Sequence, residues 1–211
     1  MANGRFITIE GGEGAGKSTQ IRRLAARLSP RVGAPLETRE PGGSPGAEAL
    51  RGLLVTGAAD RWSPLAETLI LFAAREDHLT RRIRPALAAG QWVLCDRFSD
   101  STRAYQGAAG GTDPALIAAL EAGVIGPTQP DLTLLLDLPV EAGLARAAAR
   151  GDAEARFEGK GLAFHQRLRD GFLAIAAAEP ERVCVIDAAR DPDAVEAAVW
   201  TAVRTRLGIG E

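Results

Sequence analysis

A glycine-rich segment near the N-terminus constrains the fold of this chain more than any other feature. Residues 11–18 read Gly-Gly-Glu-Gly-Ala-Gly-Lys-Ser and directly follow an apolar run at 6–9. This is the G-x-x-x-x-G-K-[ST] pattern of a phosphate-binding loop, which is specific when a strand precedes it and a helix follows it. Glycines at 11, 12, 14 and 16 let the backbone adopt positive φ angles and turn its N–H groups toward a phosphate, while Lys17 adds a positive charge. Ser18 would offer its hydroxyl to Mg²⁺ at the start of the next helix, so the segment predicts a nucleotide-binding loop.

Four further apolar runs predict the rest of a parallel sheet. They lie at 36–38, 92–95, 132–136 and 183–186, and they show little alternation of polar with apolar residues. Such runs are typical of strands that are buried on both faces, and helical stretches separate them. We therefore expect an α/β fold in which crossover helices connect parallel strands.

Start and stop signals place several helices. Three of them begin at a capping residue followed by proline, namely Ser63-Pro64, Asp113-Pro114 and Asp191-Pro192. Gly90 and Gly123 follow helical runs and would end helices. The segment from about 146 to 161 is polar and rich in small residues, which predicts a mobile lid over the site. The chain, 1–211, is therefore expected to form a single domain.

Composition argues against several classes of function. The 211 residues carry a formal net charge of −2 and two histidines, so neither nucleic-acid binding nor a structural zinc site is expected. The chain does not begin with the pattern of a signal peptide, and no apolar run approaches the ~18 residues of a membrane span. We therefore expect a cytoplasmic protein without membrane association. Cys95 and Cys184 lie in separate apolar runs and are expected to be reduced and buried.

Charged residues follow two of the expected strands. Asp96-Arg97 comes after the run at 92–95 and would lie beside the phosphate loop if the two strands are neighbours. There Asp96 could organise Mg²⁺ or accept a proton, and Arg97 could bind a phosphate through two hydrogen bonds. The alternative is that Asp96 only caps the strand end. Arg39, in the segment Arg-Glu-Pro-Gly-Gly, offers a second phosphate ligand, although an exposed arginine in a turn is common.

These motifs, together with Ser-Thr-Arg-Ala-Tyr-Gln-Gly at 101–107, resemble those of the bacterial thymidylate kinases in order and spacing over nearly the whole chain. The resemblance implies a P-loop nucleoside monophosphate kinase with a three-layer fold, in which helices flank a five-stranded parallel sheet and a short arginine-rich lid covers the site. It implies transfer of the γ-phosphoryl group of ATP to dTMP, giving dTDP for dTTP synthesis, with Mg²⁺ as cofactor. It also implies a homodimer formed through helices that pack face to face.

The resemblance assigns roles residue by residue. The ATP-binding residues would be Gly11, Gly12, Glu13, Gly14, Ala15, Gly16, Lys17, Ser18 and Thr19. The Mg²⁺ ligands would be Ser18 and Asp96. The dTMP-binding residues would be Glu13, Arg39, Pro41, Phe72, Arg75, Arg97, Ser101, Tyr105 and Gln106. The catalytic residues would be Lys17, Asp96, Arg97, Arg146, Arg150 and Arg156.

Within the dTMP site, the resemblance implies a division of labour. Arg39 and Arg97 would hold the phosphate, Glu13 the 3′-hydroxyl and Arg75 the O4 atom of thymine, while Ser101 and Gln106 face the base edge and Tyr105 crowds the 2′ position of the sugar. An arginine at O4 rejects cytosine, because the amino group at that position leaves buried donors unpaired. Uracil is harder to exclude, since one methyl group contributes only about 1–3 kcal/mol.

Catalytic positive charge would come from the lid. The phosphate loop has no arginine of its own, and Arg146 and Arg150 lie four residues apart on one expected helix face, with Arg156 just beyond. An arginine delivered to the transferred phosphoryl group contributes on the order of 10³ or more in rate in comparable enzymes. The alternative is a solvated helix face, as basic segments usually are.

Four residues are open to more than one interpretation. The family has a phenylalanine four residues before the base-binding arginine, whereas here Leu71 stands there and Phe72 is three before Arg75. Either could cover the base, or Phe72 could belong to the core. Asp137 is interpreted as structural, because Asp96 better fits the metal. Glu10, next to the loop, is a candidate to hold a water of Mg²⁺.

Other functions make different demands on the sequence. A guanine-nucleotide switch needs an Asn/Thr-Lys-x-Asp motif, but Lys17 and Lys160 are the only lysines and each follows a glycine. A kinase for another nucleoside monophosphate or for a deoxynucleoside stays open, although Arg39 and Arg97 favour a phosphorylated acceptor. An idle nucleotide-binding scaffold would be free to lose its transfer residues, and here they are present.

Overall fold

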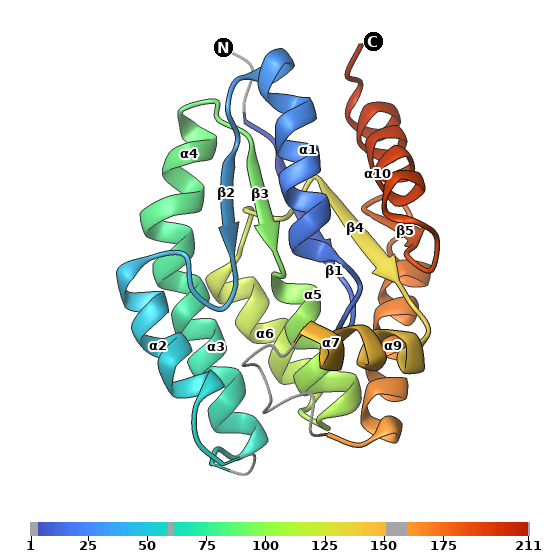
Figure 1. Cartoon of the computed structure of the whole chain (residues 1–211). Coiled ribbons are helices and arrows are strands. Elements are labelled where there is room, and N and C mark those ends of the chain that lie inside the picture. The colour runs from blue at the N-terminus through green and yellow to red at the C-terminus, as the bar shows by residue number, and fades with distance from the viewer. Residues whose placement is uncertain (1–3, 59–60, 151–159, 211) are drawn as a thin grey trace.

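The five expected strands form one parallel sheet in the structure, a computed structural model that describes residues 4–58, 61–150 and 160–210. The strands are β1 (Phe6–Glu10), β2 (Leu36–Arg39), β3 (Val93–Asp96), β4 (Leu132–Asp137) and β5 (Val183–Asp187). Their order across the sheet is β2-β3-β1-β4-β5, with every neighbouring pair parallel (Figure 1). The predicted α/β class and the five-stranded parallel sheet are therefore confirmed.

Helices connect the strands and extend beyond their carboxyl ends. In chain order they are α1 (Lys17–Val32), α2 (Pro45–Val55), α3 (Pro64–His78), the π-helical η1 (Leu79–Ile83), α4 (Arg84–Ala88), α5 (Ser99–Thr102), the π-helical η2 (Arg103–Ala109), α6 (Pro114–Val124), α7 (Val140–Arg150), α9 (Leu162–Ala178) and α10 (Pro192–Leu207). The predicted caps are present, since the side chains of Ser63, Asp113 and Asp191 each accept a backbone N–H of the first turn.

One predicted helix end is wrong. Gly123 lies inside α6, which continues to Val124, and the left-handed turn falls instead at Gly126, with φ 53°. An isolated glycine is tolerated within a helix, so its position alone did not mark the end. Gly90, in contrast, follows the end of α4 and has φ 78°, as expected.

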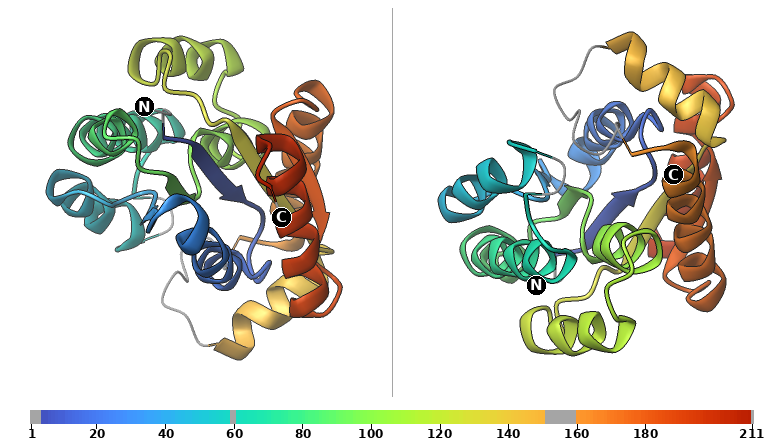
Figure 2. Two further views of the ribbon diagram at one scale, coloured as in Figure 1. Left: turned by 90° about the horizontal axis from the view of Figure 1, so that it is seen from above. Right: turned by 90° about the horizontal axis from the view of Figure 1, so that it is seen from below.

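The sheet is the middle of three layers. Helices α1 and α10 pack together on one face over the side chains of β1 and β4, among them Ile7 and Leu134. The other face is covered by α3, η1, α4 and α6, which pack on Phe6 and Val93, and by η2 and α9, which pack on Leu135. Viewed along the strands, the helices surround the sheet on both sides (Figure 2). The central strands β1, β3 and β4 therefore need apolar side chains on both faces and are almost uninterrupted apolar runs, whereas the edge strand β2, Leu-Glu-Thr-Arg, alternates between half-buried and exposed residues.

The strand order brings the predicted site residues to one edge. β1 lies between β3 and β4, with Ile9 opposite Asp96, and Asp96 is in turn opposite Arg39 of β2. The strand arrows in Figure 1 point toward the lower half of the molecule, where α5 and α7 lie. The phosphate loop, Asp96 and Arg39 therefore share the carboxyl edge of the sheet, as the sequence analysis required.

Other expectations concern the surface and the thiols. None of the helices in the described ranges is long and apolar enough to cross a membrane. Both cysteines are free thiols; Cys95 is buried and Cys184 is half-buried. The predicted lid begins within α7, and its residues 151–159 lie outside the described part of the chain.

Candidate active site

The phosphate loop has the backbone conformation that its glycines permit. Gly11, Gly14 and Gly16 have φ angles of 142°, 68° and 87°, whereas Gly12, expected to behave likewise, is not in the positive-φ region. Gly14 also packs tightly, because a Cβ atom there would lie 2.2 Å from the carbonyl oxygen of Gly143 in α7. Helix α1 begins at Lys17, within the last two residues of the loop motif, so its N-terminus faces the concave side of the loop.

Side chains at the start of α1 meet the end of β3. Ser18 Oγ donates a 2.8 Å hydrogen bond to Asp96 Oδ2, which brings together the two residues predicted to bind Mg²⁺. Lys17 Nζ donates to the carbonyl oxygens of Gly11 and Gly12, at 3.0 and 2.9 Å. Burial and the nearby Arg97 lower the pKa of Lys17. The hydroxyl, the carboxylate and the ammonium group thus surround the mouth of the phosphate loop.

Glu13 leans away from this mouth toward Arg97 and Tyr105. Its Oε1 accepts hydrogen bonds from Tyr105 Oη at 2.5 Å and from Arg97 Nη2 at 3.1 Å. Burial opposes ionisation of this carboxyl group, but Arg97, Lys17 and the Tyr105 hydroxyl outweigh it and lower its pKa to about 2. The Arg97 guanidinium also stacks 4.9 Å from the Tyr105 ring centre. Glu13 is therefore a charged acceptor on the side of the loop away from Ser18.

Glu10 stabilises the turn that begins at Arg97. Among the described non-glycine residues, Arg97 alone has a positive φ, 65°, a strained conformation that its surroundings must hold. Glu10 accepts hydrogen bonds from the backbone N–H of Phe98 at 2.7 Å and from Ser101 Oγ at 2.6 Å. Burial and the negative charge of Asp100 raise the pKa of Glu10 to about 7. Glu10 is fully buried and anchors the 97–101 turn, which does not fit the predicted role of holding a Mg²⁺ water.

A cavity opens beside Glu13 and Arg97. It contains about 750 Å³ of empty space, counting its open mouth. The lining residues are Glu13, Glu40, Pro41, Arg51, Leu54, Val55, Glu67, Leu71, Arg75, Arg97, Phe98, Ser101, Thr102, Tyr105 and Gln106. Seven of the nine residues predicted to bind dTMP are in this set; Arg39 and Phe72 are the two outside it.

Arg75 is held rigidly in the wall of this cavity. Its Nε donates to Glu40 Oε2 at 2.8 Å, and its Nη2 donates to Phe98 O at 3.1 Å and to Thr102 Oγ1 at 3.0 Å. The residue is 2% exposed, and its Nη1 has no hydrogen-bond partner among the described residues. A buried donor without a partner is rare in native proteins and requires an explanation, such as a bound ligand or an ordered water.

His78 forms a hydrogen bond with Glu40, the carboxylate that binds Arg75. Its Nδ1 lies 3.0 Å from Glu40 Oε1, and its Nε2 lies 2.7 Å from Thr38 Oγ1. Because an ionised carboxylate only accepts, Nδ1 carries the proton of its hydrogen bond to Glu40, while Nε2 shares a hydrogen bond with the threonine hydroxyl. The buried His78, Glu40 and Arg75 form one chain of hydrogen bonds with the half-buried Thr38, and this chain fixes the Arg75 guanidinium.

Leu71 and Phe72 have different environments in the structure. Leu71 lines the cavity, whereas Phe72 is 2% exposed and packs in the core with Leu79 and Ile83. The predicted contact of Phe72 with the base is therefore replaced by a core role, with its ring 4.8 Å below the Arg75 guanidinium. The one-residue shift relative to the family pattern turns the phenylalanine inward, because successive residues of a helix point in directions about 100° apart.

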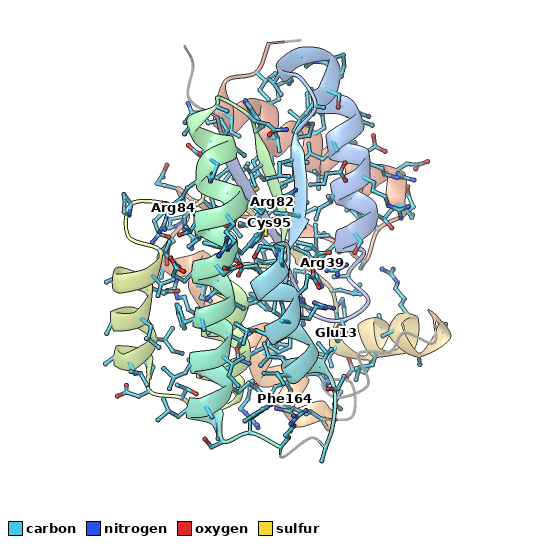
Figure 3. All side chains as sticks on the ribbon, turned by 90° about the vertical axis from the view of Figure 1, so that its left-hand side faces the viewer. Glu13, Arg39, Arg82, Arg84, Cys95 and Phe164 are labelled. Carbon is cyan, nitrogen blue, oxygen red and sulfur yellow. The ribbon has the colours of Figure 1, made fainter. Side chains whose placement is uncertain are left out.

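The remaining predicted arginines are not among the described residues that line this cavity. Arg39 is 57% exposed and pairs with Glu48, at 3.2 Å. Figure 3 shows Arg39 and Glu13 at the same end of the sheet, near the base of α1. Arg146 donates to the carbonyl oxygen of Ala188 at 3.1 Å. Arg150 ends α7, and Arg156 lies outside the described residues.

Asp137 is tied to a neighbouring helix. Its two carboxylate oxygens accept from Arg169 Nε and Nη2, at 2.7 and 2.8 Å. This bidentate ion pair joins the end of β4 to α9, which fits the structural interpretation of Asp137.

Two carboxylates in the cavity wall escaped the sequence analysis. Glu40 stands inside the segment that drew attention to Arg39, and Glu67 stands next to a helix start, but each finds its partner 35 or 39 residues along the chain. Arg51, Leu54 and Val55, on the last turns of α2, were also missed. The only available signal was the repeated apolar spacing of α2, which does not distinguish a cavity wall from a core.

Comparison with known proteins agrees with this geometry. The chain matches the family model of thymidylate kinase over residues 9–199. It is 65% identical over 209 residues to the thymidylate kinase of Caulobacter vibrioides, covering 99% of this chain and 100% of that protein. It is 57% identical over 206 residues to the thymidylate kinase of Bradyrhizobium diazoefficiens, covering 97% and 90%.

A solved structure gives the same result. The crystal structure of thymidylate kinase from Ehrlichia chaffeensis superimposes with a TM-score of 0.78 at 34% identity, covering 95% of this chain and 99% of that chain. The matches extend over the phosphate loop, the strand ends and the cavity wall alike. The chain belongs to the thymidylate kinase family.

Proposed function

We propose that this enzyme transfers the γ-phosphoryl group of ATP to dTMP, giving dTDP, with the thymine in the cavity beside Glu13. The observation that carries the proposal is Arg75, a buried guanidinium that lines this cavity and whose Nη1 lacks a partner among the described residues. Thymine O4 is an acceptor that satisfies this donor. Cytosine presents an amino group there, so its binding would leave two donors facing each other.

The charges of the site suit a phosphoryl group passing between two nucleotides. The loop N–H groups and Lys17 would hold the phosphates of ATP, and Arg97, between the loop and the cavity, would hold the phosphate of dTMP. Glu13, ionised and on the cavity side of the loop, would accept the 3′-hydroxyl of the sugar. Such an arrangement places the acceptor phosphate next to the γ-phosphate, where proximity contributes most to the rate.

Mg²⁺ fits the residues at the loop mouth. Mg²⁺ is usually held by one or two carboxylates together with substrate phosphates and water, and here the Ser18 hydroxyl and the Asp96 carboxylate lie 2.8 Å apart. When bound, the ion would neutralise phosphate charge. The Ser18–Asp96 hydrogen bond meanwhile keeps both oxygens on the same side of the loop.

We propose that the lid arginines supply further positive charge. Arg146 is held by one 3.1 Å hydrogen bond to a carbonyl oxygen, which it must release to reach a phosphate. Arg150 and Arg156 would supply the rest from the same segment, 146–161. We also propose that the enzyme works in the cytoplasm, where free thiols such as Cys95 and Cys184 are stable.

A homodimer is supported by an apolar strip on neighbouring helices. Leu65 and Leu69, one turn apart on α3, are 48% and 46% exposed, and Leu53 on the adjoining α2 is 37% exposed. Light scattering should give the mass of two chains, and Leu65→Glu with Leu69→Glu should give one. A double variant with an undiminished mass would place the interface elsewhere.

The experiment that tests the function is Mg²⁺-dependent release of ADP from ATP with a panel of acceptors. dTMP should be phosphorylated with the highest kcat/KM, well above dCMP, dAMP and thymidine. Equal rates with all monophosphates would overturn the assignment of the base site. Phosphorylation of thymidine but not of dTMP would make the protein a nucleoside kinase instead.

A further inference from the structure

We infer that Glu67 determines whether the Gln106 amide presents its carbonyl oxygen or its NH₂ group to the base, and thereby the preference for thymine over cytosine. The inference rests on the proposed binding of dTMP in the cavity and names a residue that acts through Gln106. Both side chains line the cavity, Glu67 from the first turn of α3 and Gln106 from the π-helical η2.

The orientation of the Gln106 amide follows from its neighbour. Gln106 Nε2 donates a 2.9 Å hydrogen bond to Glu67 Oε1, and the two residues are 4% and 6% exposed. A glutamine amide can be turned by 180° without changing its shape, so its direction is set by the groups around it. A carboxylate oxygen only accepts, and it therefore holds the NH₂ group toward itself. The carbonyl oxygen, on the opposite side of the planar amide, is left for the cavity.

This polarity matches one class of pyrimidine. Thymine and uracil carry a hydrogen on N3, which donates to a carbonyl oxygen. Cytosine has a bare lone pair on N3, which would face the Gln106 carbonyl oxygen without a hydrogen between them. A buried acceptor left without a donor is unfavourable, so cytosine should bind more weakly than thymine. Glu67 thus adds, at N3, a second discrimination to the one that Arg75 makes at O4.

The two base-reading groups are built in the same way. Arg75 is fixed by the buried Glu40, at 2.8 Å, and Gln106 by the buried Glu67, at 2.9 Å. Each carboxylate holds, by a hydrogen bond, a group that would read one position of the pyrimidine edge. The two groups differ in one respect. Arg75 has donors only, whereas Gln106 has both a donor and an acceptor. Its hydrogen bond to Glu67 therefore decides which of the two Gln106 offers to the base.

Glu67→Gln tests the inference with almost no change of volume. A glutamine at 67 can offer either its NH₂ or its oxygen, so it lets the Gln106 amide turn around and present NH₂ to cytosine N3. The ratio of kcat/KM for dTMP to that for dCMP should fall by at least about tenfold, equivalent to about 1.4 kcal/mol, chiefly through KM. The ratio for dTMP to dUMP should stay unchanged, because both bases carry N3–H.

The controls separate specificity from general damage. Glu76→Gln changes an exposed carboxylate on the same helix and should leave both ratios unchanged. The double variant Glu67→Gln with Gln106→Glu restores an acceptor that faces the base and should recover the preference for dTMP over dCMP. An unchanged dTMP/dCMP ratio in Glu67→Gln, or an equal fall of the dTMP/dUMP ratio, would overturn the inference.

Two further measurements test the inference if the Glu67→Gln variant does not fold. Glu67→Met removes the acceptor at similar length and is judged by the same ratios. In the wild-type enzyme without nucleotide, NMR should show the Gln106 side-chain NH₂ protected from solvent exchange, and fast exchange would refute the orienting bond. If wild-type enzyme itself shows no preference for dTMP over dCMP, the proposed base site fails. If it shows the preference and Glu67→Gln keeps it, only the role of Glu67 fails.

Discussion

Replacing Glu10 by glutamine should remove a pH-dependent cost of folding. Glu10 is fully buried, and burial together with Asp100 raises its pKa from 4.5 to about 7. The native state therefore binds a proton more tightly than the unfolded chain. The contribution of this proton to stability is present below pH 4.5 and is lost as the pH rises through 7.

The shift gives the size of the effect. A pKa change from 4.5 to about 7 corresponds to about 3 kcal/mol in full, of which about 2 to 3 kcal/mol falls between pH 5 and pH 8. Glutamine keeps the shape and an acceptor for the Phe98 N–H, but it does not titrate. The difference in unfolding free energy between wild type and Glu10→Gln should therefore move by about 2 to 3 kcal/mol, in favour of the variant, from pH 5 to pH 8.

Urea unfolding followed by circular dichroism at several pH values measures this difference. Glu48→Gln is the matched control: the Gly43 N–H lowers the pKa of Glu48, so its contribution changes below pH 4.5 and not between pH 5 and 8. A difference between wild type and Glu10→Gln that stays constant over this range would refute the assignment of a buried, protonated Glu10.

Three further predictions concern the site. Glu13→Gln should raise KM for dTMP more than for its 3′-deoxy analogue, because Glu13 is proposed to accept the 3′-hydroxyl; equal effects would contradict that role. Leu71→Ala should raise KM for dTMP with little loss of stability, whereas Phe72→Ala should destabilise the core by about 3–5 kcal/mol in urea unfolding, and the reverse pattern would put Phe72 on the base. Arg150→Ala should lower kcat with little change in KM for dTMP, and a pure KM effect would place Arg150 in ground-state binding.

Features that depend on neighbouring residues in the sequence were predicted well. The strands follow from apolar runs, and the caps at Ser63, Asp113 and Asp191 follow from a capping residue before proline. The meeting of Ser18 with Asp96 depended on one unknown, whether β1 and β3 are neighbours, and the sheet order supplies it. The residue types near the loop, together with the adjacency of β1 and β3, were therefore enough to predict which side chains meet at the mouth of the phosphate loop.

Features that depend on distant pairing were not predicted. Glu40 and Glu67 are ordinary glutamates in the sequence, and they acquire their buried partners only when α3 and η2 bring Arg75 and Gln106 against them. The inward turn of Phe72 likewise depends on which side of α3 faces the core. Composition and spacing contain no direct record of such contacts, because they arise from packing between elements.

The central claim is that the cavity beside Glu13 binds dTMP, with thymine read by Arg75 and Gln106. A crystal structure of the enzyme with dTMP tests it most directly. We predict thymine O4 within hydrogen-bond distance of Arg75 Nη1 and thymine N3 within hydrogen-bond distance of Gln106 Oε1. A base bound instead in the smaller cavity lined by Asp137 and His165 would contradict the claim.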